Sequence, residues 1–555
     1  MKKSPLAWIF RQMRQRIPGL VLMTLAQVGN ALIMVFFALG SRSVIDSAVS
    51  GDKDAFVRAC IVQACIITGS IICLAIVRHM RDRLRADLER DWKRKLLHGL
   101  LHGEYSEVSA YHSAELLNRL NNDVDRVNDG ILTILPNTAS MLTRLIAAVV
   151  VLGVLDIRLT LVIAAAGVVV IIVTSFLRQK LKDLNKQVNQ HDGKVSGFLQ
   201  ESMEKLLMVQ AMDVSQEVEN RADELLNDRY VLHRKRKNVA LMTNTGIDVM
   251  YMGAGFLALI WCAGQMLAGN MSFGSLTAVT QLVSQLQAPF ANLSGIMPKY
   301  VSMIASAERL MELEEIQGEP EPVTQDPAQM YEKMDAVKAE NLTFAYDRDE
   351  IFTDVSFSLP KGAFAVITGP SGIGKSTLLK LMLGVFHPNE GRLHLAGDGY
   401  DLTLDRSTRR LFSYVPQGNL LLSGTLRDNL IIVKPQATEE EITQALYVSA
   451  MEDYLPQLPK GLDTVLGESG SGLSEGQAQR LAIARAVLGG APVLLLDECT
   501  SALDADTEQK VLQRLKALPN RTFISVTHRP AATALCDWRL EVENGKITSV
   551  KVEQE

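Results

Sequence analysis

Long apolar runs separated by polar stretches occupy roughly the first 300 positions of the chain. A helix needs about 20 consecutive apolar residues to cross the hydrocarbon core of a bilayer. Five runs of about this length carry no charged residue, and a sixth carries only Arg144. The six runs are Ile17–Leu39, Ala59–Val77, Ile131–Leu155, Leu159–Leu177, Val249–Ala268 and Met271–Pro298. We therefore predict a domain of six membrane helices.

Two long polar segments, about residues 78–130 and 178–248, separate the second run from the third and the fourth from the fifth. Large apolar side chains recur every four residues in the first of them, at Leu84, Leu88, Trp92 and Leu96. This spacing predicts a helix with one packed face. Basic clusters flank both segments, whereas the loops on the opposite side, 156–158 and 269–270, are short. The positive-inside rule then places both segments and both chain termini in the cytoplasm.

The residues before the first run mix apolar and basic side chains. Four apolar residues share one helical face and arginines flank them: Leu6, Ile9, Phe10 and Met13, with Arg11, Arg14 and Arg16. This pattern predicts a short helix lying on the cytoplasmic surface of the membrane. The alternative interpretation is a disordered basic tail.

The pattern changes after Glu315. Residues 316–335 are rich in proline and acidic side chains, which indicates a linker. From 336 to 555, short β-branched runs alternate with helical patterns, as in a soluble α/β domain. We therefore predict a helical membrane domain over residues 1–315, a linker over 316–335 and an α/β domain over 336–555.

The composition fits a chain that is partly a membrane protein and partly a soluble domain. Mean hydropathy is +0.11, and 21% of the 555 residues are charged. The net charge of −5 provides no basic field, so we expect no nucleic-acid partner. The six cysteines include no CxxC pair, which indicates reduced structural residues rather than disulfides or metal ligands.

A glycine-rich loop in the second domain carries the strongest chemical signal. The apolar strand Ala365–Thr368 precedes GPSGIGKST at 369–377, and a helical pattern follows. This is the order of a P-loop, whose backbone N–H groups and helix N-terminus cradle phosphates. We expect Lys375 to reach the β- and γ-phosphates of ATP, and the Ser376 hydroxyl to bind Mg²⁺. The predicted nucleotide-binding residues of this loop are Gly369, Ser371, Gly372, Gly374, Lys375, Ser376 and Thr377.

Two acidic residues follow a second buried strand. Val493–Leu496 is continuously apolar and leads into Asp497 and Glu498. Asp497 at the strand end suits a water-mediated contact with Mg²⁺, and Glu498 is placed to orient or deprotonate an attacking water. The competing interpretation is that both acids cap the next helix. The P-loop favours the catalytic interpretation, because it requires an acidic partner of this kind.

Ser474 and Gln477 form a capping box before a helical run. Together with the P-loop, this stretch resembles the ATPase domain of ABC transporters. LSEGQ at 473–477 is similar to the family signature LSGGQ, and it departs from it at Glu475. We expect the departure to be tolerated, because an acidic residue suits a helix N-terminus.

The resemblance extends along the whole chain. Tyr346 matches the aromatic residue that stacks on adenine, and Gln417 matches the glutamine that contacts Mg²⁺ and faces the membrane domain. Ser501–Asp504 matches the D-loop, whose Asp504 joins the predicted nucleotide site, and His528 matches the switch histidine that senses the γ-phosphate. Thr464–Gly470, with Glu468, is similar to a stretch peculiar to exporters. The resemblance implies six membrane helices with long cytoplasmic extensions, followed by an α/β P-loop ATPase domain.

The family resemblance also implies a partner chain. In the family, the signature residues, here Ser474, Gly476 and Gln477, face a γ-phosphate held by the P-loop of a second half-transporter. The chain has one P-loop and one signature, so it needs such a partner. No motif is degenerate, which favours a homodimer over a heterodimer. His112–Val127 resembles the region after the first coupling helix of exporters, and Glu201–Val214 resembles the second; these loops link ATP binding to the membrane helices in the family.

These features predict ATP-driven export of an apolar or amphipathic compound, such as a lipid, drug or peptide, across a bacterial cell membrane by alternating access. ATP and Mg²⁺ are the expected cofactors, and Glu498 and His528 the expected catalytic residues. Alternatives are an importer on the exporter fold and a nucleotide-gated channel or regulator. A soluble ABC ATPase is excluded by the six apolar runs.

Polar side chains within the apolar runs leave the substrate open. Arg144 suits either an anionic substrate or a structural polar partner. Hydrogen bonding between helices is favoured over a substrate cavity for five amide side chains: Gln27, Asn30, Gln63, Gln281 and Gln285. Methionines gather in the fifth and sixth runs, where packing is slightly favoured over an adaptable substrate surface.

Overall fold

The computed structural model describes the chain except for residues 1–3, 320–324, 347–348, 419–420, 468–471 and 553–555. Within helices, the side chains of 166, 168–180, 247 and 287–295 also lie outside the described part. The chain divides into two compact units. The first unit comprises Met1–His98 and Ser113–Glu315, and the second comprises Gly99–His112 and Ile316–Glu555.

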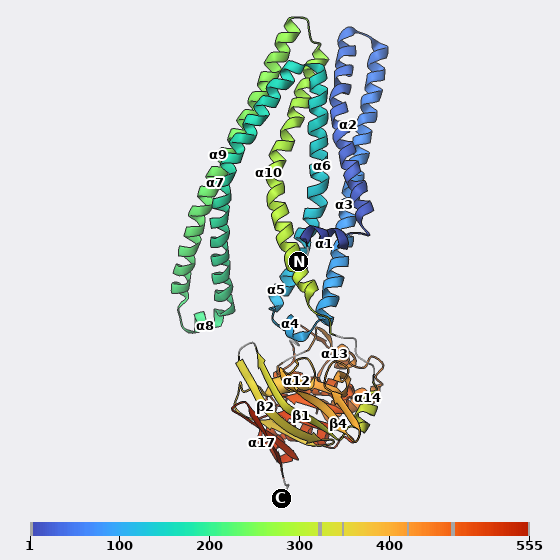
Figure 1. The fold of residues 1–555 in the computed structure, drawn as a ribbon, viewed down its shortest axis with the longest axis vertical. Coiled ribbons are helices and arrows are strands. Elements are labelled where there is room, and N and C mark those ends of the chain that lie inside the picture. The colour runs from blue at the N-terminus through green and yellow to red at the C-terminus, as the bar shows by residue number, and fades with distance from the viewer. Residues whose placement is uncertain (1–3, 320–324, 347–348, 419–420, 468–471, 553–555) are drawn as a thin grey trace. The chain divides into compact units, whose positions relative to one another are not determined.

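The first unit is built from long helices (Figure 1). They are α2 (Ile17–Ser50), α3 (Lys53–His102), α6 (Val124–Leu155), α7 (Ile157–Glu204), α9 (Ser215–Leu267) and α10 (Phe273–Glu315). Shorter pieces are α1 (Pro5–Gln12), α5 (Ser113–Asn118), the π-helical turn η1 (Arg119–Asp123) and α8 (Leu206–Ala211). Helix α6 packs against α2 and α10, whereas α7 and α9 form a long pair joined by α8.

Four stretches of helix in the described part are long and apolar enough to cross a membrane. They are α2, α3, the stretch Ser113–Leu155 that contains α6, and α9. The predicted runs Leu159–Leu177 and Met271–Pro298 fall in α7 and α10. Both run partly over side chains outside the described part, so the count of six membrane helices stays a prediction.

The predicted packed face of α3 is confirmed. Leu84, Leu88, Trp92 and Leu96 are all buried, with exposed fractions between 2% and 6%. Regular spacing of large apolar residues brings them onto one stripe, and a stripe of this kind is stable when it packs against another helix.

The N-terminal segment forms the predicted helix, α1, so the alternative of a disordered tail is wrong for Pro5–Gln12. The position of this helix on a membrane surface stays a prediction, and its apolar residues differ in how far the protein covers them. Ile9 and Met13 are buried within the first unit, while Phe10 is 54% exposed. Two anchors hold α1. The Trp8 indole packs edge-on against Trp92 of α3 at a centroid distance of 4.8 Å, and the side chains of Trp8 and Gln12 donate to Glu314 of α10.

Four of the five amide side chains inside the apolar runs bond between helices, as predicted. An amide or hydroxyl in an apolar environment is costly unless it finds a partner. The hydrogen bonds are Gln27 to Asn137 at 2.6 Å, Ser70 to Asn30 at 2.8 Å, Gln63 to Ser41 at 3.2 Å and Gln285 to the Met34 carbonyl at 2.8 Å. For Gln281, Oε1 is buried and has no hydrogen-bond partner among the described residues.

A buried carboxylate joins η1 to α10. Asp123 has no exposed surface, and it accepts hydrogen bonds from Arg309 at 2.6 and 2.8 Å and from Ser306 at 2.9 Å. Burial alone would raise the pKa of Asp123, but the hydrogen bonds from Arg309 and Ser306 outweigh it and hold the pKa below its usual value. The ion pair therefore fixes the N-terminal end of α6 to α10.

The second unit contains two main sheets. The antiparallel sheet has the order β2-β1-β4-β5 and the larger sheet the order β12-β11-β3-β10-β9-β6, in which all neighbours except β12 pair in parallel. The strands are β1 (Ala336–Tyr346), β2 (Asp349–Pro360), β3 (Phe364–Thr368), β4 (Glu390–Gly397), β5 (Tyr400–Thr403), β6 (Phe412–Val415), β7 (Gly424–Thr425), β8 (Val465–Leu466), β9 (Val493–Asp497), β10 (Thr522–Val526), β11 (Trp538–Glu543) and β12 (Lys546–Lys551).

Short helices cover this unit. They are α4 (Tyr105–Ser109), α11 (Pro327–Lys333), α12 (Lys375–Met382), α13 (Leu426–Ile431), α14 (Glu439–Val448), α15 (Glu475–Leu488), α16 (Ala505–Lys516) and α17 (Pro530–Leu535), with 3₁₀ turns η2 (Arg409–Leu411), η3 (Leu455–Gln457) and η4 (Gly461–Asp463). The two predicted strands, Ala365–Thr368 and Val493–Leu496, are present as β3 and β9. Strand β3 begins one residue early, because Phe364 pairs with Phe523 of β10.

Register brings the ends of the parallel strands level. Val526 of β10 lies opposite Asp497 of β9 and Ile367 of β3. Val415 at the end of β6 lies opposite Leu496. The loops that follow these strands therefore meet at one edge of the sheet, which is where parallel α/β sheets bind ligands.

Replacing Asp123 by Asn should destabilise the protein, because Arg309 would lose the charge that compensates it. We expect a loss of about 2 kcal/mol, less than for a fully buried pair, since Arg309 is 37% exposed. Thermal melting in nanodiscs should show a melting temperature lower by several degrees. The Asp123 contribution should be complete above the unfolded carboxyl pKa of about 3.9 and lost as pH falls through the lower folded value.

Asp125→Asn is the matched control for that change, since Asp125 follows two residues later, in the first turn of α6, and is only partly buried. It should leave the melting temperature close to that of the parent chain. Equal melting temperatures for the parent and Asp123→Asn at neutral pH would show that the ion pair contributes nothing to stability.

Candidate functional site

The loop between β3 and α12 has a backbone that only glycine adopts easily. Gly369 has φ +146° and Gly374 has φ +102°. A Cβ at Gly369 would lie 2.4 Å from the Val542 carbonyl oxygen, and one at Gly374 would lie 2.2 Å from Cγ2 of Ile351. The chain is therefore pressed against its own domain at both ends of a tight turn, and glycine turns of this kind are typical of loops that bind phosphate through their N–H groups.

Lys375 opens helix α12 and lies inside this loop. Its side chain is 5% exposed, and Nζ donates to the carbonyl oxygens of Gly369 and Pro370 at 2.8 Å each. Burial lowers the pKa of Lys375, while the nearby charges of Glu498 and Asp497 act in the opposite direction. A partly desolvated ammonium at a helix N-terminus is a strong attractor for an anion.

Asp497 is held from two sides. Ser376 Oγ donates to its Oδ1 at 3.0 Å, and the Tyr414 hydroxyl donates to its Oδ2 at 3.2 Å. Asp497 is 1% exposed, and burial raises its pKa even though both hydrogen bonds act to lower it. A hydroxyl and a carboxylate oxygen side by side are the hard oxygen donors that Mg²⁺ prefers, so the residues present fit this ion.

Glu498 adopts a left-handed backbone conformation, with φ +47°. Its N–H donates to the Val526 carbonyl at 2.9 Å, which ties it to the end of β10. Gln417 Nε2 donates to Oε2 of Glu498 at 2.8 Å. A non-glycine residue in this region of φ stores strain, and such strain is common at functional sites.

Tyr346 stands at the edge of this group. Its hydroxyl lies 3.2 Å from Oγ1 of Thr377, and its ring is 38% exposed. Phe344 and Phe386 pack edge-on against it, with centroid distances of 5.0 and 5.3 Å. Phe386 also meets Tyr105 of α4 at 5.6 Å, within the same unit. The aromatic cluster holds the Tyr346 ring and leaves part of it open for stacking.

The sequence of the chain matches two family models. They are the ABC transporter transmembrane region over residues 20–290 and the ABC transporter model over residues 352–501. The chain is 30% identical to the putative multidrug export ATP-binding/permease protein YgaD of Bacillus subtilis, over 80% of this chain and 77% of that protein. The chain belongs to the ABC exporter family.

Other members of the exporter family share comparable similarity. The mitochondrial iron-sulfur clusters transporter ATM1 of Kluyveromyces lactis is 30% identical over 72% of this chain and 56% of that protein. The chain spans about half the length of several such curated relatives. A solved structure of a bacterial Atm1-family ABC exporter with ATP bound matches with a TM-score of 0.77 at 24% identity, over 97% of this chain and 95% of that one. At this identity, the likeness shows the fold.

The residues that resemble the family signature lie at the start of α15. The predicted capping box is confirmed: Ser474 Oγ accepts from the Gln477 N–H at 3.3 Å, and Gln477 Oε1 accepts from the Ser474 N–H at 2.8 Å. Gly476 has to be glycine-sized, because a Cβ would lie 2.8 Å from the Ala502 carbonyl oxygen. Glu475 is exposed in the first turn, where its charge suits the helix N-terminus.

The exporter's predicted site residues do not all meet. The P-loop, Tyr346, Gln417, Asp497 and Glu498 form one group. In the part of the chain that the structure describes, no hydrogen bond or ion pair joins Ser474 or Gln477 to the P-loop. Asp504 instead caps α16 by accepting from the Thr507 N–H at 2.9 Å.

Four further positions named in the sequence analysis complete this account. His528 is exposed two residues after the end of β10, Ser371 and Gly372 are exposed at the tip of the P-loop, and Glu468 lies outside the described residues. Exposed groups at the strand-end edge remain accessible to a ligand or to another chain.

Residues that sequence reasoning missed brace the exporter's D-loop. Arg529 donates to the carbonyls of Ser501 at 2.7 Å and Leu503 at 2.8 Å, and to the buried Glu508 at 2.9 Å. Gln479 of α15 donates to Ser501 Oγ at 2.9 Å. The only sequence signal was the position of Arg529 directly after His528, which is too weak to predict these contacts.

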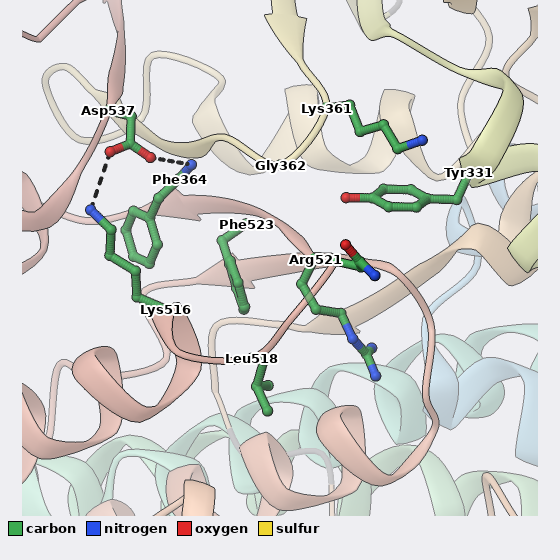
Figure 2. A pocket seen from close by; sticks show the side chains of 10 residues that line it. Tyr331, Lys361, Gly362, Phe364, Lys516, Leu518, Arg521, Phe523 and Asp537 are labelled. Carbon is green, nitrogen blue, oxygen red and sulfur yellow. Dashed lines mark hydrogen bonds and ion pairs between the residues drawn. The ribbon is translucent and has the colours of Figure 1, made fainter.

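A cavity of about 370 Å³ lies at the opposite end of β3 and β10, around their first residues (Figure 2). The rings of Phe364 and Phe523 stack beside it at 5.6 Å, and Lys361 extends over the ring of Tyr331 at 4.8 Å. None of the predicted nucleotide-site residues lines it. The cavity is therefore separate from the strand-end site.

Gly369→Ala should damage both stability and ATP binding, because its Cβ would meet the backbone at Val542 and displace the loop. Gly362→Ala is a matched control, since φ is +79° there but nothing lies within 4 Å of the added Cβ. We expect Gly369→Ala to cost about 2 kcal/mol more than Gly362→Ala. Thermal melting and binding of a fluorescent ATP analogue measure the two effects. Equal losses for both variants would contradict the close approach.

Proposed function

We propose that the chain hydrolyses ATP to export an apolar or amphipathic compound, such as a lipid, drug or peptide, across a membrane by alternating access. Membership of the ABC exporter family and the group formed by Lys375, Ser376, Asp497 and Glu498 support this. The strand-end group carries the proposal. Ser376 of the anion cradle bonds to Asp497, which gives a site suited to Mg²⁺, and the strained Glu498 follows Asp497 directly and accepts from Gln417.

Each residue of this group has a role in the proposal. The loop amides and Lys375 would bind the phosphates, and Tyr346 would stack on adenine. Ser376, Gln417 and Asp497 would hold Mg²⁺, which supplies positive charge against the phosphate oxygens. Glu498 would orient or deprotonate the attacking water, and His528 would contact the γ-phosphate from the end of β10.

A second copy of the chain would complete the site. Ser474, Gly476 and Gln477 start a helix whose free N–H groups suit a γ-phosphate, yet they make no hydrogen bond to the P-loop within the described part of the chain. Exposed apolar side chains around α8 also call for a partner: Met203 is 67%, Leu207 81% and Met212 64% exposed. We propose a homodimer, since no motif is degenerate; a heterodimer is the alternative.

Arg144 is the one polar feature of the first unit that we connect with the substrate. Arg144 Nε is buried, without a hydrogen-bond partner among the described residues, within a helix long enough to span a membrane. Relatives carry names as different as iron-sulfur clusters transporter and putative multidrug export protein, so the family alone leaves the substrate open.

We propose a bacterial plasma membrane location with both termini cytoplasmic, in keeping with the positive-inside rule.

The ATPase rate of the chain in lipid nanodiscs tests the function. We expect basal hydrolysis that one class of lipid, drug or peptide raises severalfold, and that Glu498→Gln lowers at least about a hundredfold. Uptake of that compound into inside-out vesicles should require ATP. Accumulation in the opposite direction would identify an importer, and hydrolysis without any compound movement would identify a regulator or channel.

Pairing of inactive chains tests the dimer. Lys375→Ala removes the P-loop lysine and Ser474→Ala removes the signature hydroxyl, and each alone should lose most of its ATPase rate. A mixed dimer, isolated by two affinity tags, would contain one intact site with the P-loop of one chain and the signature of the other. Partial recovery of the rate in this mixed dimer is expected. No recovery above the two separate variants would contradict a site shared between copies.

A further inference from the structure

Strand register places Tyr414 next to the acid at the end of β9. Tyr414 of β6 lies directly opposite Leu495. Leu495 and Asp497 share one face of β9, because side chains alternate along a strand. Two residues of a strand span roughly 6.6 Å, which is about the length of a tyrosine side chain. The hydroxyl therefore meets the carboxylate, and the 3.2 Å hydrogen bond to Oδ2 is the result.

Strand β6 and the loop after it supply one donor to each of the two acids. Tyr414 donates to Asp497, and Gln417, three residues later, donates to Glu498. Ser376 occupies the other oxygen of Asp497. With Oδ2 held by Tyr414, the plane of the carboxylate is fixed and Oδ1 is directed at Ser376, where the proposed ion would bind.

The Tyr414 ring is held firmly enough to do this. It is partly buried and packs against the main apolar core of the second unit, which contains Phe386, Leu378 and Val493. A side chain locked by packing loses little further freedom when its hydroxyl bonds. A phenylalanine would fill the same space and remove only the hydrogen bond.

We propose that Tyr414 is a positioning residue for the Mg²⁺ site. Its hydroxyl orients Asp497 toward the ion and connects strand β6 to the metal side of the ATP site. The proposal rests on the ATP site described under the proposed function. It assigns to Tyr414 no contact with nucleotide or ion. Groups that orient a metal-binding carboxylate typically change metal affinity by 10- to 100-fold when removed, and a water-mediated contact places the expected effect near tenfold.

The test measures Mg²⁺ through nucleotide binding, apart from turnover. A fluorescent ATP analogue is titrated onto the Glu498→Gln chain in nanodiscs, with and without Tyr414→Phe, over a range of Mg²⁺ concentrations. Mg²⁺ should strengthen binding of the analogue. We expect Tyr414→Phe to raise about tenfold the Mg²⁺ concentration at which this increase in nucleotide binding is half-maximal. Nucleotide affinity in the absence of Mg²⁺ should stay within about twofold of the parent, because the P-loop is intact.

Tyr331→Phe is the matched control. Its hydroxyl also makes a single hydrogen bond from a buried ring, to Thr522 Oγ1 at 3.0 Å, and it lies at the cavity of Figure 2, at the far end of β10. It should leave the Mg²⁺ dependence unchanged. With Glu498 intact, high Mg²⁺ should restore the ATPase rate of Tyr414→Phe, which a general loss of folding would not allow.

Three outcomes would overturn the proposal. The same Mg²⁺ dependence in Tyr414→Phe and its parent would leave Tyr414 a packing residue. An equal shift in Tyr331→Phe would attribute the effect to general loosening of the domain. If Mg²⁺ did not increase nucleotide binding even in the parent, the chain would lack the proposed metal site. Both this inference and the proposed role of Asp497 would then be wrong.

Discussion

The level pairing of the parallel strands β3, β10, β9 and β6 is the constraint on which the nucleotide site depends. Each strand ends at the same edge, so the P-loop, the two acids, the His528 loop and Gln417 arrive together from four separate parts of the chain. A slip of one residue would turn Asp497 to the other face of the sheet and away from Ser376. The fully buried runs in β9 and β10 resist such a slip, because both faces of each strand are packed.

The same constraint explains which parts of the site the sequence predicts. The P-loop and the Ser474–Gln477 capping box are encoded within a few consecutive residues, so their local structure is predictable and the box is present as expected. Tyr414 and its acceptor are 83 positions apart, and Arg529 and Glu508 are 21 apart. Contacts of this kind depend on strand register and helix placement, which no local pattern encodes.

The membrane half shows a similar limit. A repeat of four residues was enough to predict the packed stripe of α3, because one helix determines its own faces. The sequence predicted α1 as a helix but not its anchors, because Trp92 and Glu314 lie far along the chain from Trp8. Likewise, amide side chains inside apolar runs indicated bonds between helices, but their partners became known only once the helices were placed beside one another.

Helix α4 has a consequence for how the two halves are joined. It comes from the N-terminal half of the sequence, yet Gly99–His112 packs as part of the second unit. Gly103 pairs with Gly318, the Glu104 N–H donates to the Gln317 carbonyl at 2.9 Å, and Tyr105 contacts Phe386. A polypeptide beginning at 316 would therefore lack α4, and the residues that α4 contacts, among them Phe386 and Gln317, would lose these partners. Exchange of such halves between relatives would succeed only if a small loop from the membrane part were inherited together with the soluble part.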